Sequence, residues 1–108
     1  MSTLTKIKAT ELAEGLKAGR LHLIDIREAD EHAREHIPGA VLIPLSRLEE
    51  AHVKIEADCT AVFHCKSCMR TEKNCDRLAA RIDGDAYILD GGMDAWKQAG
   101  FPVASGPR

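Results

Sequence analysis

Apolar residues along the chain fall into short continuous runs separated by longer amphipathic or charged stretches. The runs have the length of strands and predict strands over residues 21–26, 41–43, 61–65 and 86–89. The stretches between them predict helices over residues 10–18, 28–35, 46–53, 71–82 and 94–99. Because strands and helices alternate, the pattern favours an α/β fold with a parallel sheet of four or five strands and helices on both faces.

Residues 64–71, His-Cys-Lys-Ser-Cys-Met-Arg-Thr, join the apolar strand at 61–65 to the next predicted helix. Ligands bind at the carboxyl ends of strands in such sheets, and Cys65 lies at such an end. Neighbouring cations and a helix N-terminus favour the reactive thiolate, and no Asp or Glu occurs between Asp58 and Glu72. Successive backbone N–H groups in such a turn hold an anion. The sequence therefore predicts a nucleophilic Cys65 within an anion-binding loop made of Lys66, Ser67, Cys68, Met69 and Arg70.

Composition and charge limit the alternatives. With 108 residues, 44% of them hydrophobic and 30% charged, the chain is expected to form one domain with a core at about 5–104 and a tail at 105–108. A net charge of −2 gives no reason to expect nucleic acid or an anionic membrane as a partner. No signal peptide and no apolar stretch of the roughly 20 residues that span a membrane is recognisable. Three of the four cysteines lie between residues 65 and 75, which favours reactive thiols in a reducing, cytoplasmic setting over a disulfide framework.

A zinc site is the competing interpretation of the cysteine-rich loop. Cys65 and Cys68 form a Cys-x2-Cys pair, and His64 and Cys75 lie nearby. Such a pair is only half of a structural zinc site, and Cys75 falls on the apolar stripe of its predicted helix. We therefore predict no metal and no organic cofactor. His64 is interpreted either as an acid or base for Cys65 or, with more weight, as a hydrogen-bonded residue at the end of its strand.

Three segments carry a resemblance to a known family. The spacing from Cys65 to Arg70, Cys-x4-Arg, resembles the active-site loop of the rhodanese (thiosulfate sulfurtransferase) family, whereas phosphatases on a related fold have one more residue in the loop. Residues 23–40, with Leu-Ile-Asp-Ile-Arg and His-Ile-Pro-Gly-Ala, resemble the first rhodanese signature, and residues 89–103 resemble the C-terminal one. The three occur in the family's order along nearly the whole chain. Their wording is most similar to rhodanese domains that precede a membrane hairpin in some bacterial proteins, so the chain is identified as a soluble or cytoplasmic domain of that kind.

The resemblance implies a fold, a reaction and its partners. It implies a single rhodanese-like domain that moves a sulfane sulfur in two half-reactions. The Cys65 thiolate takes the outer sulfur of thiosulfate or of a small persulfide, and a thiophilic acceptor then removes it: cyanide in vitro, a thiol or a sulfur-carrier protein in vivo. Two alternatives stay open. One is a non-catalytic persulfide carrier or regulatory module. The other, against which the short loop argues, is a cysteine-dependent phosphatase or arsenate reductase.

The resemblance also assigns supporting roles and marks one departure. Asp25 and Arg27 are expected to support the active-site region from the end of their strand, and Gly91 and Gly92 to form a tight turn beside the loop. Many rhodanese loops have glycine where this chain has Cys68. Cys68 is interpreted either as a tolerated small side chain or as a redox partner of Cys65. In the second reading it forms a reversible disulfide with Cys65 or accepts its sulfur.

Overall fold

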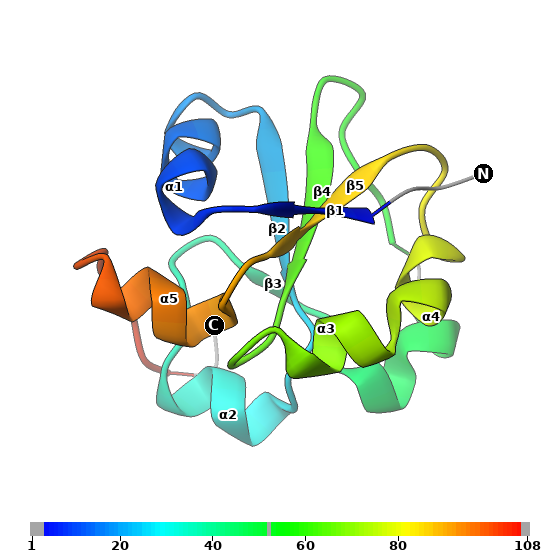
Figure 1. Ribbon diagram of the computed structural model, residues 1–108. Helices are drawn as coiled ribbons and strands as arrows, with labels where there is room; N and C mark the ends of the chain where they lie inside the picture. Colours follow the sequence, from blue (N-terminus) through cyan, green and yellow to red (C-terminus); the bar gives the residue numbers. More distant parts are fainter. Residues whose placement is uncertain (1–3, 52, 107–108) are drawn as a thin grey trace.

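The computed structural model describes residues 4–51 and 53–106, and its centre is one parallel sheet with the strand order β1-β5-β4-β2-β3 (Figure 1). The predicted α/β fold with a parallel sheet is thereby confirmed, with five strands. The strands are β1 (Leu4–Ile7), β2 (Leu21–Asp25), β3 (Val41–Leu42), β4 (Thr60–His64) and β5 (Ala86–Leu89).

Strand β1 is the element that the apolar pattern did not predict. It pairs with β5 at one edge of the sheet, and of its four residues only Ile7 is buried. An edge strand with one buried side chain leaves no apolar run in the sequence, because its other side chains face solvent or are only partly covered.

Helices lie on both faces of the sheet (Figure 1). The single helix predicted over residues 71–82 is replaced by two short helices over residues 69–73 and 75–79. They are separated by Asn74, whose side-chain amide donates to the Arg70 carbonyl at 2.8 Å. The helix predicted at 46–53, of which residue 52 lies outside the described residues, is a 3₁₀ helix over residues 45–50, and the Ser46 hydroxyl donates to Glu28. The helices are α1 (Ala9–Lys17), α2 (Ala29–Arg34), η1 (Leu45–Glu50), α3 (Met69–Lys73), α4 (Cys75–Ala79) and α5 (Gly92–Gln98).

Two apolar clusters, one on each face, hold the layers together. Successive side chains of β4 point to opposite faces of the sheet and so contribute to both clusters. Val62 packs in the cluster with α1 and α5, and Phe63 packs in the cluster with α4 and η1. The cluster of Phe63 also contains Cys65 and Cys68, so both cysteines are part of the core.

The register between β2 and β4 sets the position of the polar residues. It pairs Asp25 with His64, the last residue of each strand, so the two side chains reach the same carboxyl edge of the sheet. The loop that begins with Cys65 leaves the sheet from this edge. In the described part of the chain, no helix has the length and apolar character needed to cross a membrane.

Candidate active site

Cys65 lies at the carboxyl end of β4, in the centre of the sheet, and is completely buried. Two backbone N–H groups of the first turn of α5 fix the loop: Met93 donates to the Cys65 carbonyl and Asp94 to the Lys66 carbonyl, both at 2.9 Å. Among residues 4–51 and 53–106, no acceptor forms a hydrogen bond with the N–H groups of residues 66–70. The loop therefore turns carbonyls toward α5 and keeps a run of free amide donors.

Gly92 makes this contact between α5 and the loop possible. A Cβ at this position would lie 2.5 Å from the Cys65 carbonyl oxygen and 2.7 Å from that of Lys66. The backbone at Gly92 also has a φ of +57°, which residues other than glycine rarely adopt. The tight turn that the sequence suggested at Gly91 and Gly92 is present, and its physical reason is the approach of two backbone segments.

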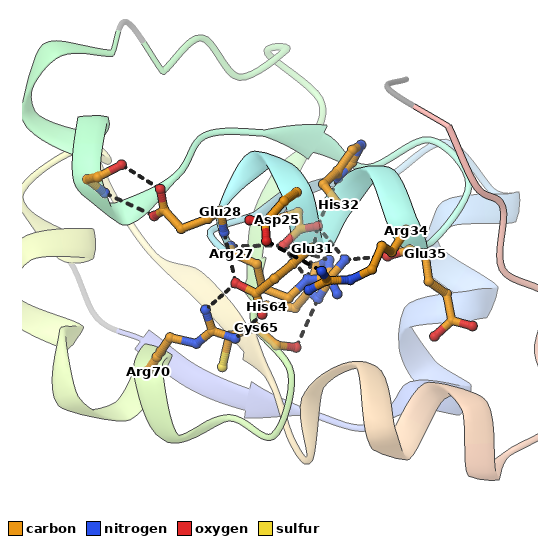
Figure 2. A network of polar contacts seen from close by, with 12 residues as sticks. Asp25, Arg27, Glu28, Glu31, His32, Arg34, Glu35, His64, Cys65 and Arg70 are labelled. Atoms are coloured by element: carbon orange, nitrogen blue, oxygen red, sulfur yellow. Dashed lines mark hydrogen bonds and ion pairs between the residues drawn. The ribbon is translucent and has the colours of Figure 1, made fainter.

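Arg70 pairs with a carboxylate of a neighbouring helix (Figure 2). Its two terminal guanidinium nitrogens each donate to one oxygen of Glu31 on α2, at 2.8 Å. The Glu31 carboxylate raises the pKa of Arg70, with a smaller contribution from Cys65, and the Arg70 hydrogen bonds hold the pKa of Glu31 at about 2. In this structure Arg70 ties α3 to α2 and supplies positive charge near Cys65.

Asp25 is the centre of a buried polar network beneath the loop (Figure 2). Arg27 donates to it from Nε, Nη2 and its backbone N–H, and His32 Nδ1 lies 2.8 Å from its Oδ2. Burial alone would raise the pKa of Asp25, but these donors and the nearby His64 outweigh it and hold the pKa at about 2. Arg27 also donates to the Glu35 carbonyl at 2.6 Å, so the Asp25 carboxylate, through His32 and Arg27, anchors the C-terminal part of α2 to the sheet.

His64 is fully buried between this network and Cys65. Its Nδ1 lies 3.2 Å from the Cys65 carbonyl oxygen and is therefore the protonated nitrogen of the ring. Its Nε2 has no hydrogen-bond partner among the described residues and stands 3.8 Å from the Asp25 carboxylate. Burial lowers the pKa of His64 from 6.5 to about 4, against the opposing pull of Asp25. The neutral ring touches the backbone of Cys65, as expected of a strand-end residue that positions the loop.

Cys68 and Thr71 complete the inner surface of the loop. The Thr71 hydroxyl donates to the Cys68 carbonyl at 2.8 Å, and it lies 3.4 Å from the Cys68 sulfur and 3.9 Å from the Cys65 sulfur. Burial raises the pKa of the Cys68 thiol, although hydrogen bonds from Thr71 and the Gly91 backbone oppose this.

Lys66 stands at the outer rim of the loop. Its side chain is 66% exposed and lies 3.4 Å from the half-exposed carboxylate of Asp94. An open cleft of about 440 Å³ begins there and runs between side chains of α2 and α5, with charges of both signs along its walls. Of the described residues, no three His, Cys, Asp or Glu side chains lie close enough together to hold a metal ion.

The structure shows which of the residues singled out in the sequence lie near one another. The structure brings together the loop residues 65–70 with Asp25 and Arg27, at the edge that the sequence suggested. Sequence reasoning missed the contacts of Glu31, His32 and Thr71. A cation at a helix start is unfavourable, which signals that Arg70 needs an anion, but nothing in the sequence identifies Glu31 as that anion.

Comparisons with known proteins place the chain in a family. Residues 8–99 match the family model described as the rhodanese-like domain. The chain is 34% identical over 95 residues to the putative sulfurtransferase YtwF of Bacillus subtilis, covering 87% of this chain and 91% of that protein. It is 32% identical over 102 residues to the transcriptional regulator Rv0324 of Mycobacterium tuberculosis, of the helix-turn-helix type, covering 93% of this chain. This chain spans only 45% of the length of that regulator.

Solved structures share the fold. A thiosulfate sulfurtransferase from Pseudomonas aeruginosa superimposes with a TM-score of 0.84 at 27% identity, over 98% of this chain and 20% of the other. A rhodanese-related protein from Thermoplasma volcanium superimposes with a TM-score of 0.77 at 27% identity, over 93% and 97% of the two chains.

Substitution of Gly92 tests the contact between α5 and the loop. We expect Gly92→Ala to lower the free energy of unfolding by about 3 kcal/mol, because its Cβ would overlap two backbone carbonyls. Gly19→Ala is the matched control, since Gly19 also has a positive φ, of +72°, but its Cβ would meet no atom within 4 Å. The control should lose only about 1 kcal/mol. Denaturant unfolding measures both, and equal losses would contradict the close approach.

The buried His64 makes stability depend on pH. Its pKa is about 4 in the folded state and near 6.5 when unfolded, so between these values the unfolded chain binds more protons. Stability should therefore fall as the pH is lowered from 6.5 to 4, by up to about 3 kcal/mol. His64→Asn should flatten this part of the profile, whereas His22→Asn, in the partly exposed start of β2, should leave it in place. A profile that His64→Asn does not change would show that His64 is not held neutral.

Proposed function

The chain belongs to the rhodanese family, and on this premise we propose that it is a sulfurtransferase that carries a sulfane sulfur on Cys65. The observation that carries the proposal is the run of unpaired N–H groups at residues 66–70, directly after a buried cysteine. Such a loop stabilises a small anion at the cysteine sulfur, and the terminal sulfur of a persulfide is an anion of that kind. The relatives named as sulfurtransferases support the same reaction class.

In the first half-reaction, the Cys65 thiolate attacks the outer sulfur of thiosulfate or of a small persulfide. A sulfur–sulfur bond forms at Cys65, the bond within the donor breaks, and its electron pair leaves with sulfite or with a thiolate. The negative charge then sits on the terminal sulfur, where the N–H groups of residues 66–70 stabilise it. The positive charges of Arg70 and Lys66 act at longer range and favour an anionic donor.

In the second half-reaction, an acceptor nucleophile attacks the terminal sulfur and releases the Cys65 thiolate. The acceptor is cyanide in an assay, and a thiol or a sulfur-carrier protein in the cell. The charged cleft beside Lys66 offers this acceptor an approach along α2 and α5. Asp25, Arg27 and His64 act as positioning residues, because they hold α2 and the Cys65 backbone without touching the reacting sulfur in the resting protein.

A persulfide carrier or sulfur-responsive regulatory module is the second candidate. One observation favours it: the chain matches part of a transcriptional regulator. Slow turnover with cyanide, together with rapid transfer to a protein acceptor, distinguishes a carrier from a small-molecule enzyme. Hydrolysis of an aryl phosphate in place of thiosulfate turnover would instead point to phosphatase chemistry.

Replacement of the nucleophile tests the proposal. We expect Cys65→Ser to lose more than 95% of the activity with thiosulfate and cyanide, on the order of what removal of a covalent nucleophile causes, while the fold is kept. Intact-mass measurement after thiosulfate treatment should show one added sulfur on the parent and none on Cys65→Ser. Cys75→Ser, in α4, should behave as the parent. A sulfur-loaded Cys65→Ser protein would refute the assignment.

The Arg70–Glu31 pair should matter more than the Lys66–Asp94 pair. Arg70→Ala removes a two-point ion pair that joins α3 to α2, whereas Lys66 makes one exposed contact. We expect kcat/KM to fall roughly tenfold or more for Arg70→Ala, and roughly threefold or less for Lys66→Ala. Glu31→Gln should reproduce part of the Arg70 effect. A larger loss at Lys66 would reverse this ranking and make the rim charge the dominant one.

A further inference from the structure

The loop contains two buried thiols that contact one hydroxyl. Cys65 is fully buried and Cys68 is 2% exposed. The Thr71 hydroxyl lies 3.4 Å from the Cys68 sulfur and 3.9 Å from the Cys65 sulfur, so both sulfurs approach the same small group. Both sulfurs belong to the same apolar cluster and are sheltered from molecules in solution.

The backbone at Cys68 is unusual for a cysteine. Its φ is +79°, and within residues 4–51 and 53–106 it is the one residue other than glycine with a positive φ. A side chain in this conformation costs about 1 kcal/mol, which glycine would avoid. Cys68 keeps this unfavourable backbone conformation and contacts Thr71, which also contacts Cys65. The combination suggests that the Cys68 thiol has a chemical function.

A persulfide on Cys65 has two sulfurs with different access. An external acceptor that enters by the cleft meets the terminal sulfur, and attack there transfers the sulfane sulfur. The inner sulfur is the Cys65 sulfur itself, which is completely buried. Attack on this atom requires a thiol that is already inside the loop, and Cys68 is that thiol.

We propose that Cys68 is a resolving thiol that attacks the inner sulfur of the Cys65 persulfide and releases the terminal sulfur as hydrogen sulfide. The proposal rests on the proposed function, since it needs the persulfide. The Cys68 thiol gives its proton to the terminal sulfur of the Cys65 persulfide anion, and the Cys68 sulfur forms a bond to the Cys65 sulfur. The bond within the persulfide breaks, and its electron pair leaves on the protonated terminal sulfur as HS⁻. The two thiols are oxidised to a disulfide, and the sulfane sulfur is reduced to sulfide.

The cycle closes with an external reductant. A low-molecular-weight dithiol, or two monothiols, reduces the Cys65–Cys68 disulfide and restores both thiols. The protein thereby gains a second outcome for the same intermediate: transfer when an acceptor nucleophile is present, and thiol-dependent sulfide release when it is absent. Formation of the disulfide brings the two sulfurs to bonding distance, and this draws the Cys65 sulfur away from the N–H groups of the loop.

A single-turnover experiment without external thiol tests this step. The reduced, desalted protein is treated anaerobically with thiosulfate, or with an alkyl persulfide followed by rapid desalting, and sulfide and intact mass are followed in time. We expect the parent to release about one equivalent of sulfide per chain. It should end as the disulfide form, two hydrogens lighter, with the Cys65 and Cys68 peptides cross-linked. Cys75→Ser should give the same result.

Two variants of Cys68 separate its chemistry from its effect on folding. Cys68→Ser keeps the size of the side chain, and Cys68→Gly removes the positive-φ cost, so at least the second should fold as well as the parent. Both should gain one sulfur on Cys65 and keep it, with sulfide release at least tenfold slower than in the parent.

The outcomes distinguish this step from the proposed function. If the parent holds its persulfide as long as Cys68→Gly does, or if the added sulfur is found on Cys68, the resolving role is wrong although sulfur transfer stands. It is also wrong if both variants fail to load while the parent releases sulfide. If neither the parent nor the variants gain sulfur or release sulfide with either donor, the proposed function itself fails.

Discussion

The contact between the start of α5 and the loop after β4 decides what this domain can do. Two N–H groups of α5 donate hydrogen bonds to the carbonyls of Cys65 and Lys66. These two carbonyls therefore have donors, while the N–H groups of the loop stay free. This arrangement requires the absence of a side chain at Gly92, since any Cβ would meet both carbonyl oxygens. The donors around Cys65 therefore depend on a glycine that lies 27 residues further along the chain, at the end of a different strand.

A second constraint is a set of ion pairs and hydrogen bonds at the carboxyl edge of the sheet. The ionised Asp25 carboxylate receives Arg27 and His32, and Arg70 joins α3 to α2 through Glu31. The pKa values of Asp25 and Glu31, both near 2, reflect these donors. Each bond holds a helix against the loop, so the charges serve to fix distances around Cys65. Removal of one partner would leave a buried charge unpaired, which is why such networks tolerate change poorly.

Much of this architecture can be predicted from the sequence, because apolar runs and the strand-end position of Cys65 are local signals. Strand β1 could not be predicted because an edge strand with one buried residue has no apolar run. The break in the helix at Asn74 could not be predicted because the apolar positions on both sides keep helical spacing. The Asn74 side chain accompanies this break with a hydrogen bond to the backbone. The partner of Arg70 depends on the packing of α2 against α3, and no spacing within the chain encodes that. The sequence marked Cys68 only as a departure from the family's glycine, and its positive φ and its contact with Thr71 became visible only in the folded chain.

The central claim is that the N–H groups of residues 66–70 hold the terminal sulfur of a Cys65 persulfide. Amide ¹H–¹⁵N spectra of Cys68→Gly, recorded before and after loading with thiosulfate, test it directly, because this variant is expected to retain the persulfide. The account predicts downfield proton shifts concentrated at residues 66–70, as free donors gain an acceptor, with little change at the N–H groups of Met93 and Asp94, which are already bonded. Loading that leaves the amide protons of residues 66–70 unchanged would contradict it.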